Sequence, residues 1–136
     1  SAEKESALAA YGLNLGMAFQ VVDDLFDYTL GTSQLGKDVG SDLREGKMTL
    51  PLIQGLKQVG DGDREWMVRV VQDPNFSTED FSKLVGLLQA SGATRYAEKA
   101  AEAYIFKAKA ALALFPQTET LGTLKDIADY ALHRRA

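Results

Sequence analysis

Three carboxylates at helical spacing are the residues of this sequence whose types most directly suggest chemistry. Asp23, Asp24 and Asp27 lie in the stretch of residues 19–28, where the other side chains are mostly apolar. Burying that much negative charge is unfavourable unless a cation compensates it. On a helix, Asp23 and Asp27 would leave one face with their Cβ atoms about 5–6 Å apart. We therefore expect this segment to face a cation; the alternative is an ordinary solvated helix face.

The ligand types in this region indicate which cation it would be. Gln20 and Gly16 continue the stripe of Asp23 and Asp27 toward the N-terminus by one helical turn each. The chain has no cysteine and a single histidine, so the available ligands are oxygen atoms. Mg²⁺ prefers one or two carboxylates together with retained water molecules and a substrate phosphate. The sequence therefore predicts a helix that presents Mg²⁺ to a phosphorylated ligand.

Length and composition limit the other possibilities. The 136 residues suffice for one domain, and we expect a single all-helical unit over residues 1–136. The net charge is −4, with 15 basic residues dispersed among 19 acidic ones, so no surface for nucleic acid is expected. No apolar run approaches the ~20 residues of a membrane span, and no signal peptide is visible, so we expect no stable membrane insertion and a cytoplasmic location. The chain opens inside a helical pattern, which indicates a piece of a longer protein.

The element that must carry the aspartates is a long helix. Apolar residues recur every three or four positions and predict a helix over residues 3–30. Gly12 and Gly16 weaken such a helix by about 1 kcal/mol each relative to alanine, so we expect them to permit close approach of a neighbouring helix or a ligand. Residues 31–48 are polar and rich in glycine, which is typical of a functional loop.

Capping signals predict the helices that follow. Thr49 is the expected N-cap of a short helix to residue 58, and Ser77 with Asp80 forms the expected capping pair of a helix to residue 89. Gly92 is the expected C′ residue of that helix. Further helices are predicted over residues 63–71, 93–114 and 120–133. No stretch alternates convincingly with period two, so the predicted fold class is all-α.

Two neighbouring segments carry a family resemblance. Residues 16–28 read Gly-Met-Ala-Phe-Gln-Val-Val-Asp-Asp-Leu-Phe-Asp-Tyr, and residues 35–53 read Leu-Gly-Lys-Asp-Val-Gly-Ser-Asp-Leu-Arg-Glu-Gly-Lys-Met-Thr-Leu-Pro-Leu-Ile. They resemble the second aspartate-rich motif and the following loop and helix of medium- and long-chain trans-type polyprenyl diphosphate synthases. The family's first aspartate-rich motif and the basic residues that hold its homoallylic diphosphate are missing. The resemblance thus implies a helical bundle, the C-terminal part of an isoprenoid-synthase-type fold, and a fragment that is inactive alone.

The resemblance also implies a reaction and a role for each aspartate. The family joins isopentenyl diphosphate to an allylic diphosphate: diphosphate leaves, the isopentenyl double bond attacks the allylic carbocation, and a proton is removed. Negative charge builds on the leaving diphosphate, and preorganised cations stabilise it. In this scheme Asp23 ligates a Mg²⁺ ion that touches the diphosphate, and Asp24 and Asp27 are ligands or hold its water molecules.

Four more residues receive roles from the same resemblance. Gln20 would hydrogen-bond near the reacting centre, and Phe19 would line the apolar tunnel that shields the cation from water. Lys37 would reach over the diphosphate as a mobile point charge, and Lys47 would add to that field. The expected catalytic residues are then Asp23, Gln20 and Lys37. The alternatives are an ordinary helix amide for Gln20, plain core for Phe19, and solvent-exposed loop positions for both lysines.

Other functions stay open beside this one. The chain could belong to another class I terpenoid enzyme such as a terpene cyclase, although the second metal site there typically mixes Asn, Ser or Thr with acids. It could also be a catalytically silent helical subunit or interaction module of a two-component synthase, or a phosphate-binding module without turnover. A homodimer is implied for the complete enzyme. Arg134 and Arg135 are expected to be solvated rather than folded over the diphosphate site.

Overall fold

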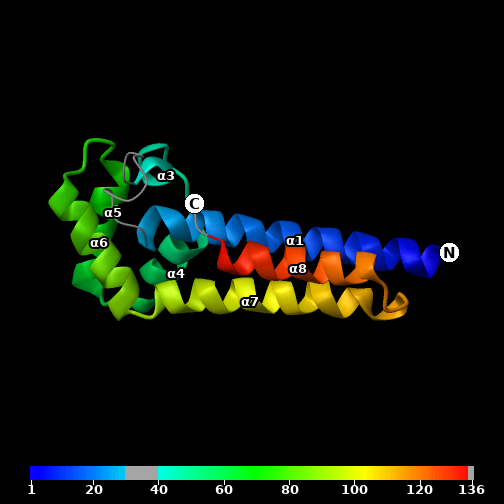
Figure 1. Cartoon of the computed structure of the whole chain (residues 1–136). Helices are drawn as coiled ribbons and strands as arrows, with labels where there is room; N and C mark the ends of the chain where they lie inside the picture. The colour runs from blue at the N-terminus through cyan, green and yellow to red at the C-terminus, as the bar shows by residue number, and fades with distance from the viewer. Residues whose placement is uncertain (30–39, 135–136) are drawn as a thin grey trace. The chain divides into compact units, whose positions relative to one another are not determined.

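The regular elements of the chain are helices. The computed structural model describes residues 1–29 and 40–134, and within that part no strand is formed, which confirms the predicted all-α class (Figure 1). No helix in these two ranges is long and apolar enough to cross a membrane. The elements are α1 (Ala2–Thr29), α3 (Ser41–Arg44), α4 (Leu50–Gln58), α5 (Asp61–Gln72), α6 (Thr78–Ala90), α7 (Ala93–Ala111), the 3₁₀ turn η1 (Leu112–Leu114) and α8 (Glu119–His133).

The chain divides into two compact units, and the first unit contains both the N-terminal and the C-terminal segments of the chain. This unit comprises residues 1–22 and 99–136, in which α1, α7 and α8 run alongside one another (Figure 1). Its core contains several small side chains, which let helices approach closely, and Tyr11 donates a hydrogen bond of 2.7 Å to the carbonyl oxygen of Leu124. The buried members are Tyr11, Ala18, Ile105, Ala108, Leu112, Leu121, Ala128 and Ala131.

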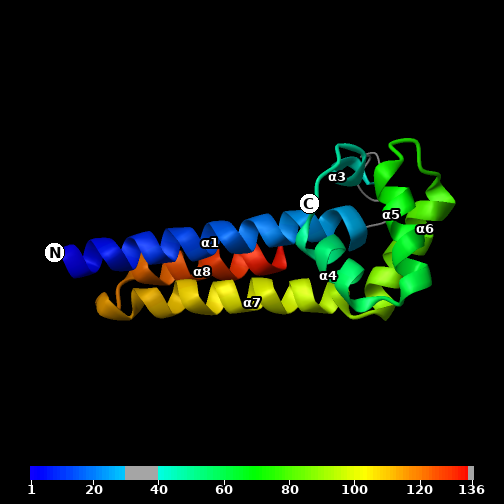
Figure 2. The ribbon, with the colours of Figure 1, turned by 180° about the vertical axis from the view of Figure 1, so that it is seen from behind.

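The second unit comprises residues 23–98 and has a core of larger side chains. It contains the end of α1, the helices α3 to α6 and the start of α7 (Figure 2). The ring of Phe81 stacks on Tyr28 at a centroid distance of 6.0 Å and on Phe76 at 5.8 Å. The largest buried members are Tyr28, Leu43, Leu52, Met67, Phe76, Phe81, Leu84 and Leu88. The boundary between the units falls inside α1 and α7, so these two helices run through both units. The expectation of a single all-helical unit over residues 1–136 stays a prediction.

Several local predictions are confirmed. The long first helix is present with nearly the predicted bounds. The hydroxyl of Ser77 accepts a 3.0 Å hydrogen bond from the backbone N–H of Asp80, as the capping pair predicts. Gly92 follows the C-cap of α6 with a φ of 86°, a left-handed conformation that glycine adopts without a Cβ penalty.

Other local predictions need correction. The predicted loop over residues 31–48 contains the short helix α3, because the buried side chain of Leu43 attaches this segment to the core. The helix predicted to residue 114 ends at Ala111 and tightens into η1 shortly before Pro116. Thr49 occupies the N-cap position of α4 but makes no capping hydrogen bond there, because its hydroxyl instead donates to the Tyr28 hydroxyl at 3.4 Å. The helices α5 and α8 begin slightly earlier than predicted.

Gly12 and Gly16 lie on an open face of α1. Apart from the adjacent residues and the helix's own backbone, no described atom lies within 4 Å of a Cβ built on either residue, so no other described helix packs closely on them. Close approach of a ligand at these glycines stays a prediction.

Candidate metal and phosphate site

The three aspartates lie on the last two turns of α1 and differ in burial. Asp23 is exposed, whereas Asp24 and Asp27 are half-buried. Leu25 and Tyr28, which alternate with them along this end of the helix, are buried in contact with the core. Apolar burial therefore fixes the orientation of the helix end, and the aspartates occupy the sides that this burial leaves.

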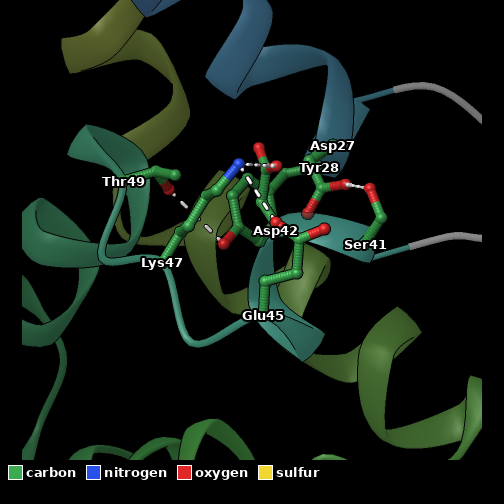
Figure 3. Close-up of polar contacts among 7 residues, drawn as sticks. All are labelled: Asp27, Tyr28, Ser41, Asp42, Glu45, Lys47 and Thr49. Carbon is green, nitrogen blue, oxygen red and sulfur yellow. Dashed lines mark hydrogen bonds and ion pairs between the residues drawn. The ribbon is translucent and has the colours of Figure 1, made fainter.

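Asp27 meets the short helix α3 (Figure 3). The hydroxyl of Ser41 donates a hydrogen bond of 3.5 Å to Asp27 Oδ1. The other carboxylate oxygen, Oδ2, is buried and has no hydrogen-bond partner among residues 1–29 and 40–134. A buried polar atom without a partner is unfavourable by about 1–3 kcal/mol, and more when the group is charged. A cation beside Oδ2 would remove this penalty, so the donor set fits a hard metal ion.

The electrostatics of Asp27 agree with that fit. Burial raises the pKa of its carboxyl group, and the nearby charge of Asp42 raises it further. The backbone N–H groups of Asp42 and Leu43 and the hydroxyl of Ser41 lower the same pKa and offset part of the rise. Among the described residues, the groups that raise the pKa of Asp27 therefore outweigh those that lower it.

Lys47 forms ion pairs with two acidic residues, Asp42 of α3 and Glu45 directly after α3. Its ammonium group is 3.1 Å from Glu45 Oε2 and 3.4 Å from Asp42 Oδ1, and its side chain is 58% exposed (Figure 3). The hydrogen bond to Glu45 contributes most to raising the pKa of Lys47, and the charges of Glu45 and Asp42 raise this pKa further. Exposed ion pairs of this kind are weak, so an incoming diphosphate could exchange with them. The predicted role of Lys47 toward substrate stays a prediction.

Phe19 and Gln20 belong to the first unit and are described there. Gln20 is exposed, and Phe19 is half-buried against the core of its unit. The guanidinium group of Arg134 lies 4.3 Å from the centroid of the Phe19 ring, and its Nη2 donates a 3.0 Å hydrogen bond to the Phe19 carbonyl oxygen. The expectation that Arg134 is solvated is therefore wrong, because ring stacking and a backbone acceptor hold it against α1. Lys37 and Arg135 lie outside the described residues.

Sequence reasoning missed two residues of this site, Ser41 and Asp42. Both were assigned to a loop, but the apolar Leu43 directly after them is a signal that this part of the loop is anchored. In the described ranges no three His, Cys, Asp or Glu side chains gather closely enough to hold a metal ion by themselves. Mg²⁺ does not require such a cage, because it keeps water molecules and takes phosphate oxygens as further ligands.

Comparison with known proteins relates the chain to one family. The family model described as polyprenyl synthetase matches residues 1–88. The octaprenyl diphosphate synthase of Escherichia coli is 36% identical over 132 residues, which are 97% of this chain and 41% of that protein. The chain therefore spans about two fifths of the length of the curated relatives it matches.

Two solved structures add the fold and their own ligands. The polyprenyl synthase of Caulobacter crescentus, crystallised with calcium and isoprenyl diphosphate, superposes with a TM-score of 0.90 and 42% identity, over all of this chain and 42% of that chain. The geranylgeranyl pyrophosphate synthase of Corynebacterium glutamicum, crystallised with isoprenyl diphosphate and magnesium, gives a TM-score of 0.87 at 27% identity, over 99% of this chain and 39% of that one. Their helical folds match that of this chain over almost its whole length.

Proposed function

This chain belongs to the polyprenyl synthetase family, and from that premise we propose that it forms the part of a trans-polyprenyl diphosphate synthase that carries the second aspartate-rich motif. The complete enzyme would condense isopentenyl diphosphate with an allylic diphosphate. The observation that carries this proposal is Asp27, whose buried oxygen lacks a partner in the described chain while Asp23 on the same helix faces solvent. A homodimeric, cytoplasmic enzyme, inactive as this fragment alone, is proposed from the family resemblance.

The proposed division of labour follows the burial of the three acids. Asp23 would hold a divalent metal ion, proposed to be Mg²⁺, and Asp24 and Asp27 would be further ligands or hold its water molecules. The metal supplies positive charge that stabilises the leaving diphosphate. The two related crystal structures with calcium or magnesium and isoprenyl diphosphate support this choice of ligands.

The remaining residues would bind and shield the substrate. Lys37 and Lys47 would bind the diphosphate as mobile charges. Gln20 would hydrogen-bond near the reacting carbon, and the half-buried ring of Phe19 would exclude water from it. Arg134 stacks on the ring of Phe19 and would limit its motion.

A catalytically silent helical subunit is the second candidate, and one observation favours it. Leu8, Leu13 and Met17 are exposed along α1, Leu13 by 68%, which suits contact with another protein surface. A silent subunit has no need to bind metal and diphosphate. Metal-dependent diphosphate binding therefore separates the two candidates.

The test is calorimetric titration of the 136-residue chain with inorganic diphosphate, with and without Mg²⁺. We expect binding that requires Mg²⁺ and that Asp23→Ala abolishes. Asp126→Ala is the matched control, because Asp126 is also an exposed aspartate within a helix, α8. Diphosphate binding that does not require Mg²⁺ and is unchanged in Asp23→Ala would contradict the assignment of the metal site.

A further inference from the structure

We propose that helix α3 is a positioning element for Asp27, in which Ser41 holds the carboxylate and the core of the second unit holds α3. This inference rests on the proposed function, since it assigns α3 to the metal site proposed there. Ser41 and its supports would act through Asp27 and would not touch the substrate.

The first step of the argument is the contact itself. Ser41 Oγ is 3.5 Å from Asp27 Oδ1, and the two side chains point toward each other across the gap between α1 and α3 (Figure 3). The backbone N–H groups of Asp42 and Leu43, on the same short helix, also hydrogen-bond the carboxylate. Oδ2 remains without a partner among the described residues. One oxygen of the carboxylate is thus oriented by the protein, and the other remains for a different ligand.

The second step is the rigidity of α3, which a four-residue helix cannot supply by itself. Leu43 is only 2% exposed and belongs to the core cluster of this unit. Gly40, at the N-cap, has a φ of 72°, and a Cβ there would lie 2.9 Å from ring atoms of Phe76 and Phe81. The guanidinium group of Arg44 lies 4.6 Å from the centroid of the Phe76 ring. Gly40 before α3 therefore packs on Phe76 and Phe81, and Arg44 at the end of α3 packs on Phe76.

The third step connects the same support to α1. Tyr28, directly after Asp27, is 1% exposed and stacks on Phe81. Its hydroxyl accepts a hydrogen bond from Thr49. Phe81 therefore contacts both the residue after Asp27 and the residue before Ser41. A shared aromatic support of this kind sets the separation between α1 and α3, and with it the place of the carboxylate.

The experiment measures the Asp27 side chain directly, in metal-free solution of the 136-residue chain. Three-bond couplings from Asp27 Cγ to the backbone nitrogen and carbonyl carbon report the populations of its χ1 rotamers. We expect one dominant rotamer in the parent chain, a smaller population of that rotamer in Ser41→Ala, and recovery in Ser41→Thr, which restores a hydroxyl. Ser91→Ala is the matched control, since Ser91 is also half-buried and donates to the carbonyl oxygen of Leu88 at 3.3 Å. Rotamer populations in Ser41→Ala equal to those of the parent chain would overturn the proposal.

A second readout connects the positioning to metal binding. Water-proton relaxation with Mn²⁺ and inorganic diphosphate gives the affinity of the metal complex for the same four proteins and for Asp23→Ala. We expect Ser41→Ala to weaken it about threefold and Ser41→Thr to restore it, as loss of one weak hydrogen bond predicts. If Asp23→Ala has no effect, the proposed function of this chain fails, while the rotamer measurement still decides the role of α3. If Asp23→Ala abolishes binding but Ser41→Ala behaves as Ser91→Ala does, the positioning role is wrong and the metal site stands.

Discussion

The middle and the last turns of helix α1 depart from ordinary burial in opposite directions. In its middle, Leu13 is 68% exposed and Met17 40% exposed, beside the open glycines at 12 and 16. In its last turns, Asp27 buries a carboxylate oxygen that no described group satisfies. Apolar side chains usually lie inside and charged ones outside. One helix thus presents both exceptions.

The two exceptions differ in what they do to stability. An exposed leucine is also exposed in the unfolded chain, so it merely forgoes about 1.5–3 kcal/mol that burial would have contributed. A buried, unpaired carboxylate oxygen loses its water on folding and destabilises the folded state outright. Packing does not account for Asp27 at the acidic end, whereas the metal site proposed above would account for it. Such a local conflict with stability is typical of functional sites.

The largest expected effect concerns the acidic end. In a full-length synthase that carries this chain, Asp23→Ala should lower turnover by about 100-fold or more, because a ligand of the metal is lost. Helical content measured by circular dichroism should hardly change, since Asp23 is exposed. Asp126→Ala, on the exposed surface of α8, should leave turnover unchanged. Equal turnover of Asp23→Ala and Asp126→Ala would contradict the proposed role of Asp23 as a metal ligand.

The next effect tests whether α3 is as firmly packed as the acidic end requires. Gly40→Ala should destabilise the chain by about 2–4 kcal/mol, because alanine is strained at a positive φ and its Cβ would collide with Phe76 and Phe81. Urea unfolding measures this loss. Gly46→Ala is the control that separates strain from collision, since Gly46 also has a positive φ but an added Cβ meets no described atom within 4 Å. Similar losses for both would show that α3 is loosely packed.

The sequence predicted the helical class and the aspartate motif because both depend on local patterns. The periodicity of apolar residues predicts the long first helix, and the helix alone is enough to predict that Asp23 and Asp27 share one face. The different burial of Asp23 and Asp27 does not follow from spacing. It arises because α3 covers one of them, and α3 itself is held by Leu43 in the core cluster and by Gly40 beside the rings of Phe76 and Phe81. Contacts between residues so far apart in the chain leave no local pattern, and the same holds for Arg134 on Phe19.

A titration experiment sharpens the comparison on the acidic side. Burial and Asp42 raise the pKa of Asp27 in the folded chain. The folded state then binds a proton more tightly than the unfolded one, so stability falls as pH rises from the ordinary carboxyl range through this raised pKa, and the loss persists above it. Asp27→Asn carries no charge and should have a higher Tm than the parent chain at pH 7 in EDTA, with the difference shrinking toward pH 3. Asp126→Asn should show no such pattern. A parent chain as stable as Asp27→Asn at pH 7 would mean that its carboxylate is compensated after all.

The smallest effect tests the exposed apolar middle of the helix. Gly12→Ala should raise stability by about 0.5–1 kcal/mol in thermal or urea unfolding, because alanine favours the helix and its Cβ meets no described atom within 4 Å. Gly55→Ala is the contrasting control: Gly55 is also helical, in α4, but a Cβ there collides with a methyl group of Leu88, so this change should destabilise. In a full-length synthase, Gly12→Ala should gain stability only if that face of α1 stays open. A loss there, with a gain in the 136-residue chain, would show that another element covers Gly12. The exposed apolar middle of α1 would then be an interface, and the helix would serve packing there and the proposed chemistry at its last turns.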